Sequence, residues 1–142
     1  MTAATAIAAE VPLMVSMPGT PRSVPVVRHW LAEVMAAHGC SGVDDALLVA
    51  SELAGNAVRH TRSGEPGGRL VVVIAFPDEV TLRLEVIDEG AETVPRPRDA
   101  DWDMESGRGL WLVEQVSRSW GEAALRDGRH AVWADLESKR VA

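Results

Sequence analysis

Hydrophobic residues recur every three or four positions in three segments of the chain, which predicts three amphipathic helices. The first is expected over residues 26–35, with Gly39 as its stop, and the second over residues 44–60. The third is expected over residues 110–120, where Leu110 and Trp120 mark the two ends of the apolar pattern. Helices with one apolar stripe need another layer to pack against.

Strands are predicted where apolar residues alternate with polar ones or form short runs. Residues 11–17 are expected to form an edge strand, because a proline lies near its start. Residues 70–76 and 80–87 predict a hairpin, and residues 123–126 and 130–136 predict a second one. The alternation in the 80–87 segment indicates a sheet with one buried and one solvated face.

The order strand, helix, helix, hairpin, loop, helix, hairpin predicts an α+β fold. We expect a two-layer α/β sandwich, in which helices cover one face of a mixed, mostly antiparallel sheet. The length of 142 residues favours a single domain over residues 1–142, with residues 1–10 as a frayed end. Periodicity is lost after residue 88, and the long segment 88–109 is typical of a lid or binding loop.

Composition narrows the classes of partner and compartment. A formal net charge of −7 disfavours direct binding to nucleic acid or to an anionic membrane surface. The longest apolar run, residues 70–76, is too short to span a bilayer. The single cysteine, Cys40, is consistent with a reducing compartment, so we expect a cytoplasmic protein.

Three short polar patterns are candidates for chemistry. Glu52 and Asn56 lie four residues apart, on one face of the second predicted helix. A hydrated metal ion with bound phosphates would satisfy them, although a solvated helix face is an alternative interpretation. Asp88-Glu-Gly90 follows a strand, and Gly107-Arg-Gly109 precedes the third helix. Each pattern alone is typical of a turn or cap, but a glycine-rich helix start also binds phosphate.

Together these patterns resemble the GHKL (Bergerat-fold) ATPases, over residues 21–136. Ser51-Glu-Leu-Ala-Gly-Asn-Ala-Val-Arg-His60 resembles the N box of that superfamily, and Val86-Ile-Asp-Glu-Gly90 resembles the first glycine box. Ser106-Gly-Arg-Gly-Leu-Trp-Leu-Val113 resembles the second glycine box. The short length of the chain and the residues of this last motif are most similar to those of the anti-sigma-factor serine/threonine kinase branch.

The resemblance implies that ATP and Mg²⁺ are the cofactors. Asn56 would coordinate Mg²⁺, Asp88 would accept a hydrogen bond from the adenine amino group, and Gly90 would let the base approach the backbone. Glu52 would be the catalytic general base. The phosphates would lie at the start of the third helix, on Gly107, Arg108, Gly109 and Leu110. We interpret Arg59 as a solvated charge at the helix end.

The chain departs from the resemblance at two positions. Ala91 replaces a glycine that often follows in the first glycine box, and Ala131 replaces a threonine that supports the adenine pocket in many relatives. Both departures predict weaker nucleotide binding.

The activity that the resemblance implies is transfer of the ATP γ-phosphate to a serine of an antagonist protein. A sigma factor would be a further partner. The alternatives are a non-catalytic ATP-binding interaction module and a stand-alone ATPase. The sequence leaves open whether the chain forms a homodimer.

Overall fold

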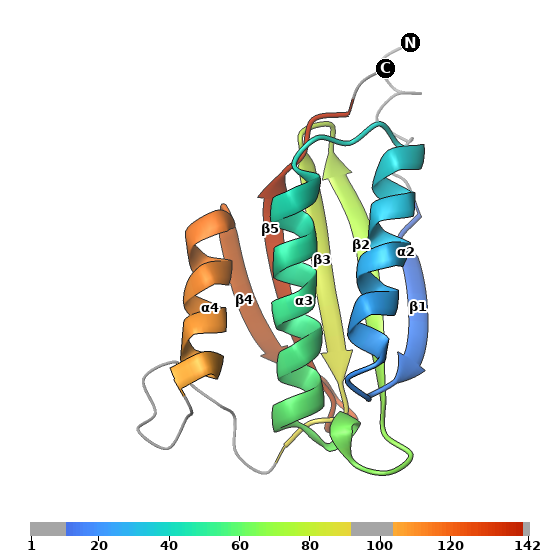
Figure 1. Ribbon diagram of the computed structural model, residues 1–142, viewed down its shortest axis with the longest axis vertical. Helices are drawn as coiled ribbons and strands as arrows, with labels where there is room; N and C mark the ends of the chain where they lie inside the picture. Colours follow the sequence, from blue (N-terminus) through green and yellow to red (C-terminus); the bar gives the residue numbers. More distant parts are fainter. Residues whose placement is uncertain (1–10, 92–103, 141–142) are drawn as a thin grey trace.

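The computed structural model of the protein describes residues 11–91 and 104–140, with side chains described from residue 109 in the second range. A five-stranded sheet carries the α-helices on one face (Figure 1). The strand order is β1-β2-β3-β5-β4, and every pairing among these strands is antiparallel. The predicted two-layer α+β architecture is therefore confirmed. The expectations for residues 1–10 and 92–103 lie outside the described residues.

Four strands follow the predicted segments closely, whereas the strand predicted at residues 123–126 starts earlier, at Ser119, and ends at Ala124. The strands are β1 (Leu13–Pro18), β2 (Arg69–Asp78), β3 (Thr81–Asp88), β4 (Ser119–Ala124) and β5 (His130–Glu137). Every second residue of β2 and β3 is buried against the helices. Asp88 continues the row of Leu82, Leu84 and Val86, so the last residue of β3 brings a carboxylate to the buried side of the sheet.

The helices are α2 (Ser23–Ala37), α3 (Val43–His60) and α4 (Met104–Val116), with a short 3-10 turn, η1 (Arg62–Gly64), after α3. Helix α3 is the central element: it packs on β2, β3 and β5 and contacts both α2 and α4. Its sheet-facing stripe is rich in alanine, and a stripe of small side chains lets the helix backbone approach the strands. No helix among the described residues is long and apolar enough to cross a membrane.

The prediction for the third helix is wrong at both ends. Helix α4 starts at Met104, inside the segment expected to be loop, and it ends at Val116. Trp120 belongs to β4, where it pairs with Ala134 and packs against the core. The apolar residues from Leu110 to Trp120 are spaced as in a single helix, although Trp120 lies in β4. Trp120 packs against the same core, so its position in the sequence extends the helical spacing by coincidence.

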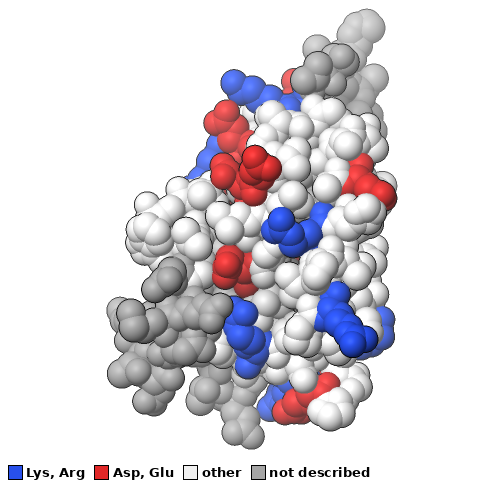
Figure 2. Space-filling model, in the orientation of Figure 1, with Lys and Arg blue, Asp and Glu red and all other residues white. Residues whose placement is uncertain are grey.

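On the other face of the sheet, no helix is formed by residues 11–91 or 104–140. Arg83 on β3 forms two hydrogen bonds with the Asp135 carboxylate on β5, at 2.6 and 2.8 Å, and its guanidinium lies over the Trp133 ring. Figure 2 shows the opposite, helix-bearing side of the molecule, where acidic and basic side chains are interspersed. The predicted division into a buried and a solvated face is therefore confirmed.

Candidate functional site

The end of β3 is fixed by a tight turn. Asp88 is 3% exposed, and its Oδ1 accepts a hydrogen bond of 2.7 Å from the Gly90 backbone N–H. The η1 turn holds the same segment from outside: Ser63 Oγ accepts from the Glu89 N–H at 3.0 Å, and the Arg62 N–H donates to the Gly90 carbonyl at 2.8 Å. Hydrogen bonds of Gly90 and η1 therefore fix the turn that carries the Asp88 carboxylate.

Gly90 has a conformation that other residues rarely adopt. Its φ is +87°, and a methyl group on its Cα would overlap the carbonyl oxygen of Gly128 in the β4–β5 turn. The sequence analysis assigns Gly90 a role in letting the base approach. In the structure, the close approach of Gly128 is already sufficient to require glycine here.

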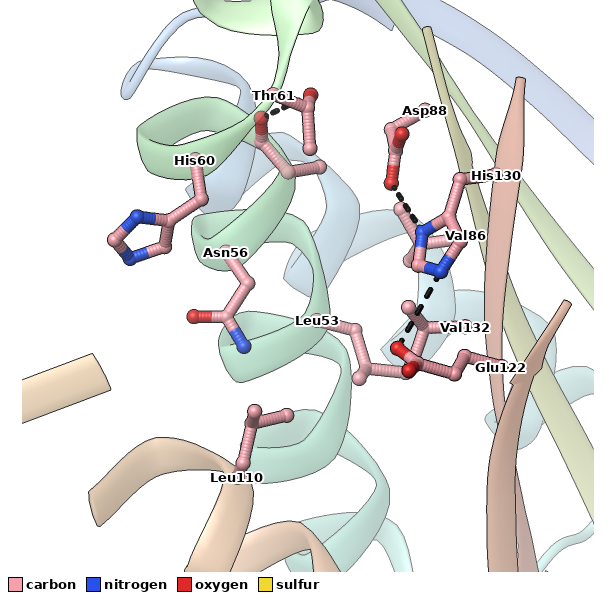
Figure 3. A pocket seen from close by; sticks show the side chains of 11 residues that line it. Leu53, Asn56, His60, Thr61, Val86, Asp88, Leu110, Glu122, His130 and Val132 are labelled. Atoms are coloured by element: carbon pink, nitrogen blue, oxygen red, sulfur yellow. Dashed lines mark hydrogen bonds and ion pairs between the residues drawn. The ribbon is translucent and has the colours of Figure 1, made fainter. Parts of the chain in front are cut away.

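His130 joins this carboxylate to β4. Its Nδ1 lies 3.2 Å from Asp88 Oδ2, and its Nε2 lies 3.3 Å from Glu122 Oε2 (Figure 3). The hydrogen bond with Asp88 is the largest cause that raises the pKa of His130 above its usual value, and Glu122 adds to the effect while burial opposes it. An imidazolium, with two donors, satisfies both carboxylates.

Sequence reasoning missed His130. The strand register pairs Asp88 with His130 and Ile87 with Ala131, so His130 lies beside Asp88 while Ala131 belongs to the neighbouring, alternate position. The residue that contacts this carboxylate is therefore His130, which is adjacent to Ala131, where the chain departs from the family pattern. The signal was present: alternation along residues 130–136 places His130 on the same face as Val132 and Ala134.

A pocket extends from Asp88 along α3. Figure 3 shows the predicted residues Asn56, Asp88 and Leu110 around it, on α3, β3 and α4. Its apolar lining includes Leu53, Val86, Leu110 and Val132. A pocket with mostly apolar walls and a few polar groups suits a flat aromatic ligand that carries hydrogen-bonding edges.

Glu52 meets α4 instead of lining this pocket. A methyl group on Gly109 would overlap the Glu52 carboxylate, so the bare backbone of α4 lies against that side chain. The structure therefore brings together two residues that the sequence places in different motifs. Because Gly109 has no side chain, the α4 backbone meets the end of the flexible Glu52 side chain directly.

The expectation that Gly107, Arg108 and Gly109 open the third helix is corrected. These residues lie inside α4, because the helix already begins at Met104. The N–H groups without helical acceptors are those of the first turn, at residues 104–107, and Gly109 is beyond that turn. An anion at this helix start would meet backbone N–H groups N-terminal to Gly109.

Asn56 has a partner within its own helix. Arg59 Nη2 donates to Asn56 Oδ1 at 3.3 Å, so the side chain that we interpreted as a solvated charge contacts the candidate metal ligand. No three His, Cys, Asp or Glu side chains gather as a metal site within the described ranges. A divalent ion here would rely on the Asn56 amide oxygen and on oxygens of its ligand, a donor set that Mg²⁺ accepts.

Comparisons with known proteins agree with this geometry. The model of the histidine kinase-like ATPase domain family matches residues 17–134. The chain belongs to this family. Its predicted resemblance to the superfamily is confirmed, and ATP is the ligand that the family implies for the pocket.

Solved structures share the fold. One is the crystal structure of the RsbU and RsbW domains of Rv1364c from Mycobacterium tuberculosis, with a TM-score of 0.64 and 21% sequence identity. The match covers 93% of this chain and 33% of that one, so the chain spans about a third of its length. A comparison with curated protein sequences gives no significant match.

The turn at Gly90 gives a prediction with a matched control. Gly90→Ala is expected to lower the free energy of unfolding by about 2–4 kcal/mol, because it combines a positive φ with overlap on Gly128. Gly67 has a similar φ of +81° with no atom near its Cα substituent, so Gly67→Ala is expected to cost about 1–2 kcal/mol. Urea denaturation measures both. Equal losses would show that the contact with Gly128 contributes nothing.

Proposed function

We propose that this ATPase-like domain is an ATP- and Mg²⁺-dependent serine/threonine protein kinase of the anti-sigma-factor type. It transfers the γ-phosphate of ATP to a serine of an antagonist protein and also binds a sigma factor. The observation that carries the proposal is the arrangement around α3: Asn56 and Asp88 line one pocket, while Glu52 lies against α4 just beyond it.

Recognition of adenine is assigned to Asp88. Its carboxylate is buried at the pocket end and is held in one orientation by the Gly90 N–H. A carboxylate accepts hydrogen bonds from the amino group of adenine, whereas guanine presents a carbonyl oxygen at the corresponding position. Two acceptors facing each other are unfavourable, so Asp88 selects adenine.

The phosphates are assigned to the region between α3 and the start of α4. Asn56 would hold Mg²⁺ through its amide oxygen, and the N–H groups of the first turn of α4 would be available to phosphate oxygens. The ion supplies neutralisation of the phosphate charge. Arg59, which contacts Asn56 Oδ1, is close enough to that oxygen to change partner when the ion binds.

Phosphoryl transfer is assigned to Glu52. The side chain is half-buried on α3, one turn before Asn56, and lies against Gly109 of α4. A carboxylate there orients the serine hydroxyl of a partner protein and accepts its proton as the oxygen attacks the γ-phosphorus. The γ-phosphate leaves ADP and becomes the phosphoserine.

A non-catalytic ATP-binding interaction module is the second candidate. The observation that favours it is that both binding groups, Asn56 and Asp88, already contact cationic side chains of the chain itself. When nucleotide replaces these internal partners, the side chains around the pocket rearrange. A partner protein can then distinguish the free state from the ATP-bound state without any transfer of phosphate. A stand-alone ATPase is the third candidate, and the assays below separate the three.

Asp88→Asn is expected to weaken ATP binding by about 10- to 100-fold, because the lost hydrogen bond is charge-assisted. Isothermal titration calorimetry with ATP and Mg²⁺ measures the change. Asp78→Asn is the control, since Asp78 is an exposed carboxylate at the end of β2, where it pairs with Thr81 at the start of β3, far from Asp88 along that strand. Equal affinities for wild type and Asp88→Asn would contradict the assignment of the adenine site.

Asn56→Ala is expected to remove the dependence of ATP affinity on Mg²⁺ while leaving the metal-free affinity within about threefold. Titrations with and without Mg²⁺ provide the comparison. Ser51→Ala is a neighbouring control, because the Ser51 hydroxyl donates to the Leu47 carbonyl within the same helix. A full Mg²⁺ effect in Asn56→Ala would place the ion elsewhere.

Glu52→Gln is expected to keep ATP affinity within about threefold and to reduce phosphoryl transfer by about 10²- to 10⁴-fold. The assay follows label from γ-labelled ATP into a small antagonist protein, with its acceptor serine replaced by alanine as the substrate control. Glu33→Gln, on the exposed side of α2, is the matched variant.

Three results of the labelling assay separate the candidate functions. Phosphoserine that depends on Glu52 supports the kinase. Free phosphate without phosphoserine supports the stand-alone ATPase. Saturable ATP binding with neither product contradicts both enzymes and supports the interaction module.

A further inference from the structure

Two hollows meet at the Asp88–His130 pair. One is the pocket along α3 that ends at Leu110, and the other opens beside Gly90, Ala91 and Gly128. Asp88, His130 and Thr61 line both hollows. The Thr61 and Asp88 side chains are held by hydrogen bonds to backbone groups, whereas the His130 ring contacts the side chains of Asp88 and Glu122. His130 is therefore the part of this shared wall that side-chain rotation can remove.

Both oxygens of the Asp88 carboxylate already have partners. Oδ1 accepts from the Gly90 N–H, a bond that belongs to the turn itself, and Oδ2 faces His130 Nδ1. His130 holds one of the two acceptor positions of Oδ2, so an amino group that approaches Asp88 from the side of the pocket where the His130 ring lies competes with His130 for that oxygen. Glu122, which is 43% exposed at its side chain, offers His130 a second carboxylate nearer to solvent.

The charged groups around His130 come from several elements. Asp88 on β3 and Glu122 on β4 contact its ring, and His60 at the end of α3 lines the same pocket. Arg129, the preceding residue, directs its guanidinium to Asp127 at 2.7 Å. The two carboxylates therefore dominate the charge that the imidazole ring meets.

We propose that His130 is a specificity-determining residue of the base pocket, which occupies Asp88 until a purine with an amino group displaces it. The proposal rests on the proposed ATP binding. On displacement, the His130 ring moves away from Asp88 toward Glu122, and the two hollows join into one cavity. The amino group of the base then donates to Asp88 Oδ2, and the Nδ1 proton of the imidazolium passes to water.

The displacement predicts a pH dependence with a definite sign. Asp88 and Glu122 raise the pKa of His130, so below that raised pKa nucleotide must displace an ion pair. ATP affinity should therefore rise as pH approaches this raised pKa from below, by up to about tenfold per pH unit because binding releases one proton. Above the raised pKa the ring is already neutral and holds Asp88 more weakly, so the affinity should level off. In the absence of nucleotide, the same pair stabilises the fold below the ordinary pKa of histidine, and this stabilisation is lost as pH rises through the raised pKa.

The test compares ATP affinities of wild type and His130→Ala between about pH 6 and about pH 9, a range that spans histidine titration. His130→Ala is expected to bind about tenfold more tightly than wild type at the acid end, and the two should converge at the alkaline end. The terminal phosphate of ATP titrates in this range in both proteins, so the ratio of affinities cancels its effect. His29→Ala, an exposed histidine on α2, is expected to follow wild type.

A ratio that is constant over the whole pH range would overturn the role of His130. If His130→Ala fails to fold, Glu122→Gln replaces it and should move the NMR titration midpoint of the His130 ring, and the pH profile of ATP binding, to lower pH. An unmoved midpoint would also overturn the proposal. Absence of ATP binding at every pH in wild type is a different result, because it contradicts the proposed function on which this inference rests.

Discussion

The buried carboxylate of Asp88 is the constraint around which the site is arranged. A buried acceptor without partners costs about 1–3 kcal/mol or more, and here the Gly90 N–H and the His130 ring remove that cost. Gly90, which donates the first bond, has a positive φ, and the close approach of the Gly128 carbonyl requires that residue to be glycine. One carboxylate thereby ties the end of β3 to the β4–β5 turn.

Helix α3 carries the other half of the site because of how it packs. Its alanine-rich stripe lies on the sheet, which brings Asn56 to the same pocket as Asp88, and Gly109 lets the α4 backbone meet Glu52. Small residues therefore have two effects. On the sheet side, the alanines of α3 allow the helix backbone to approach the strands, and on the α4 side, Gly109 leaves space for the Glu52 carboxylate. The polar pair on α3 lies where two packing surfaces meet.

The sequence predicts most of the fold, because the periodicities of α2, α3 and the four longest apolar or alternating strand segments are set by burial on one side. It fails at α4 and β4, where Trp120 continues a helical spacing from a strand. For the site, Asp88 and Asn56 are predicted by their motifs and do line one pocket. His130 is not, since its place beside Asp88 follows from the β3–β5 register, a long-range property that no local motif encodes.

The internal partners of Asn56 and Asp88 have a common physical cause. Both residues present oxygen acceptors to the pocket, and a buried acceptor such as the Asp88 carboxylate must be satisfied when no ligand is present. Arg59 and His130 do this from the chain itself, one on an exposed helix end and one mostly buried. The two side chains differ in what happens when a ligand replaces them. Arg59 returns to water and keeps its charge, whereas His130 can become neutral by losing a proton. If Mg²⁺ and the adenine base bind as proposed, exchange of Arg59 at the Asn56 end of the pocket is independent of pH, whereas exchange of His130 at the base end couples binding to protons.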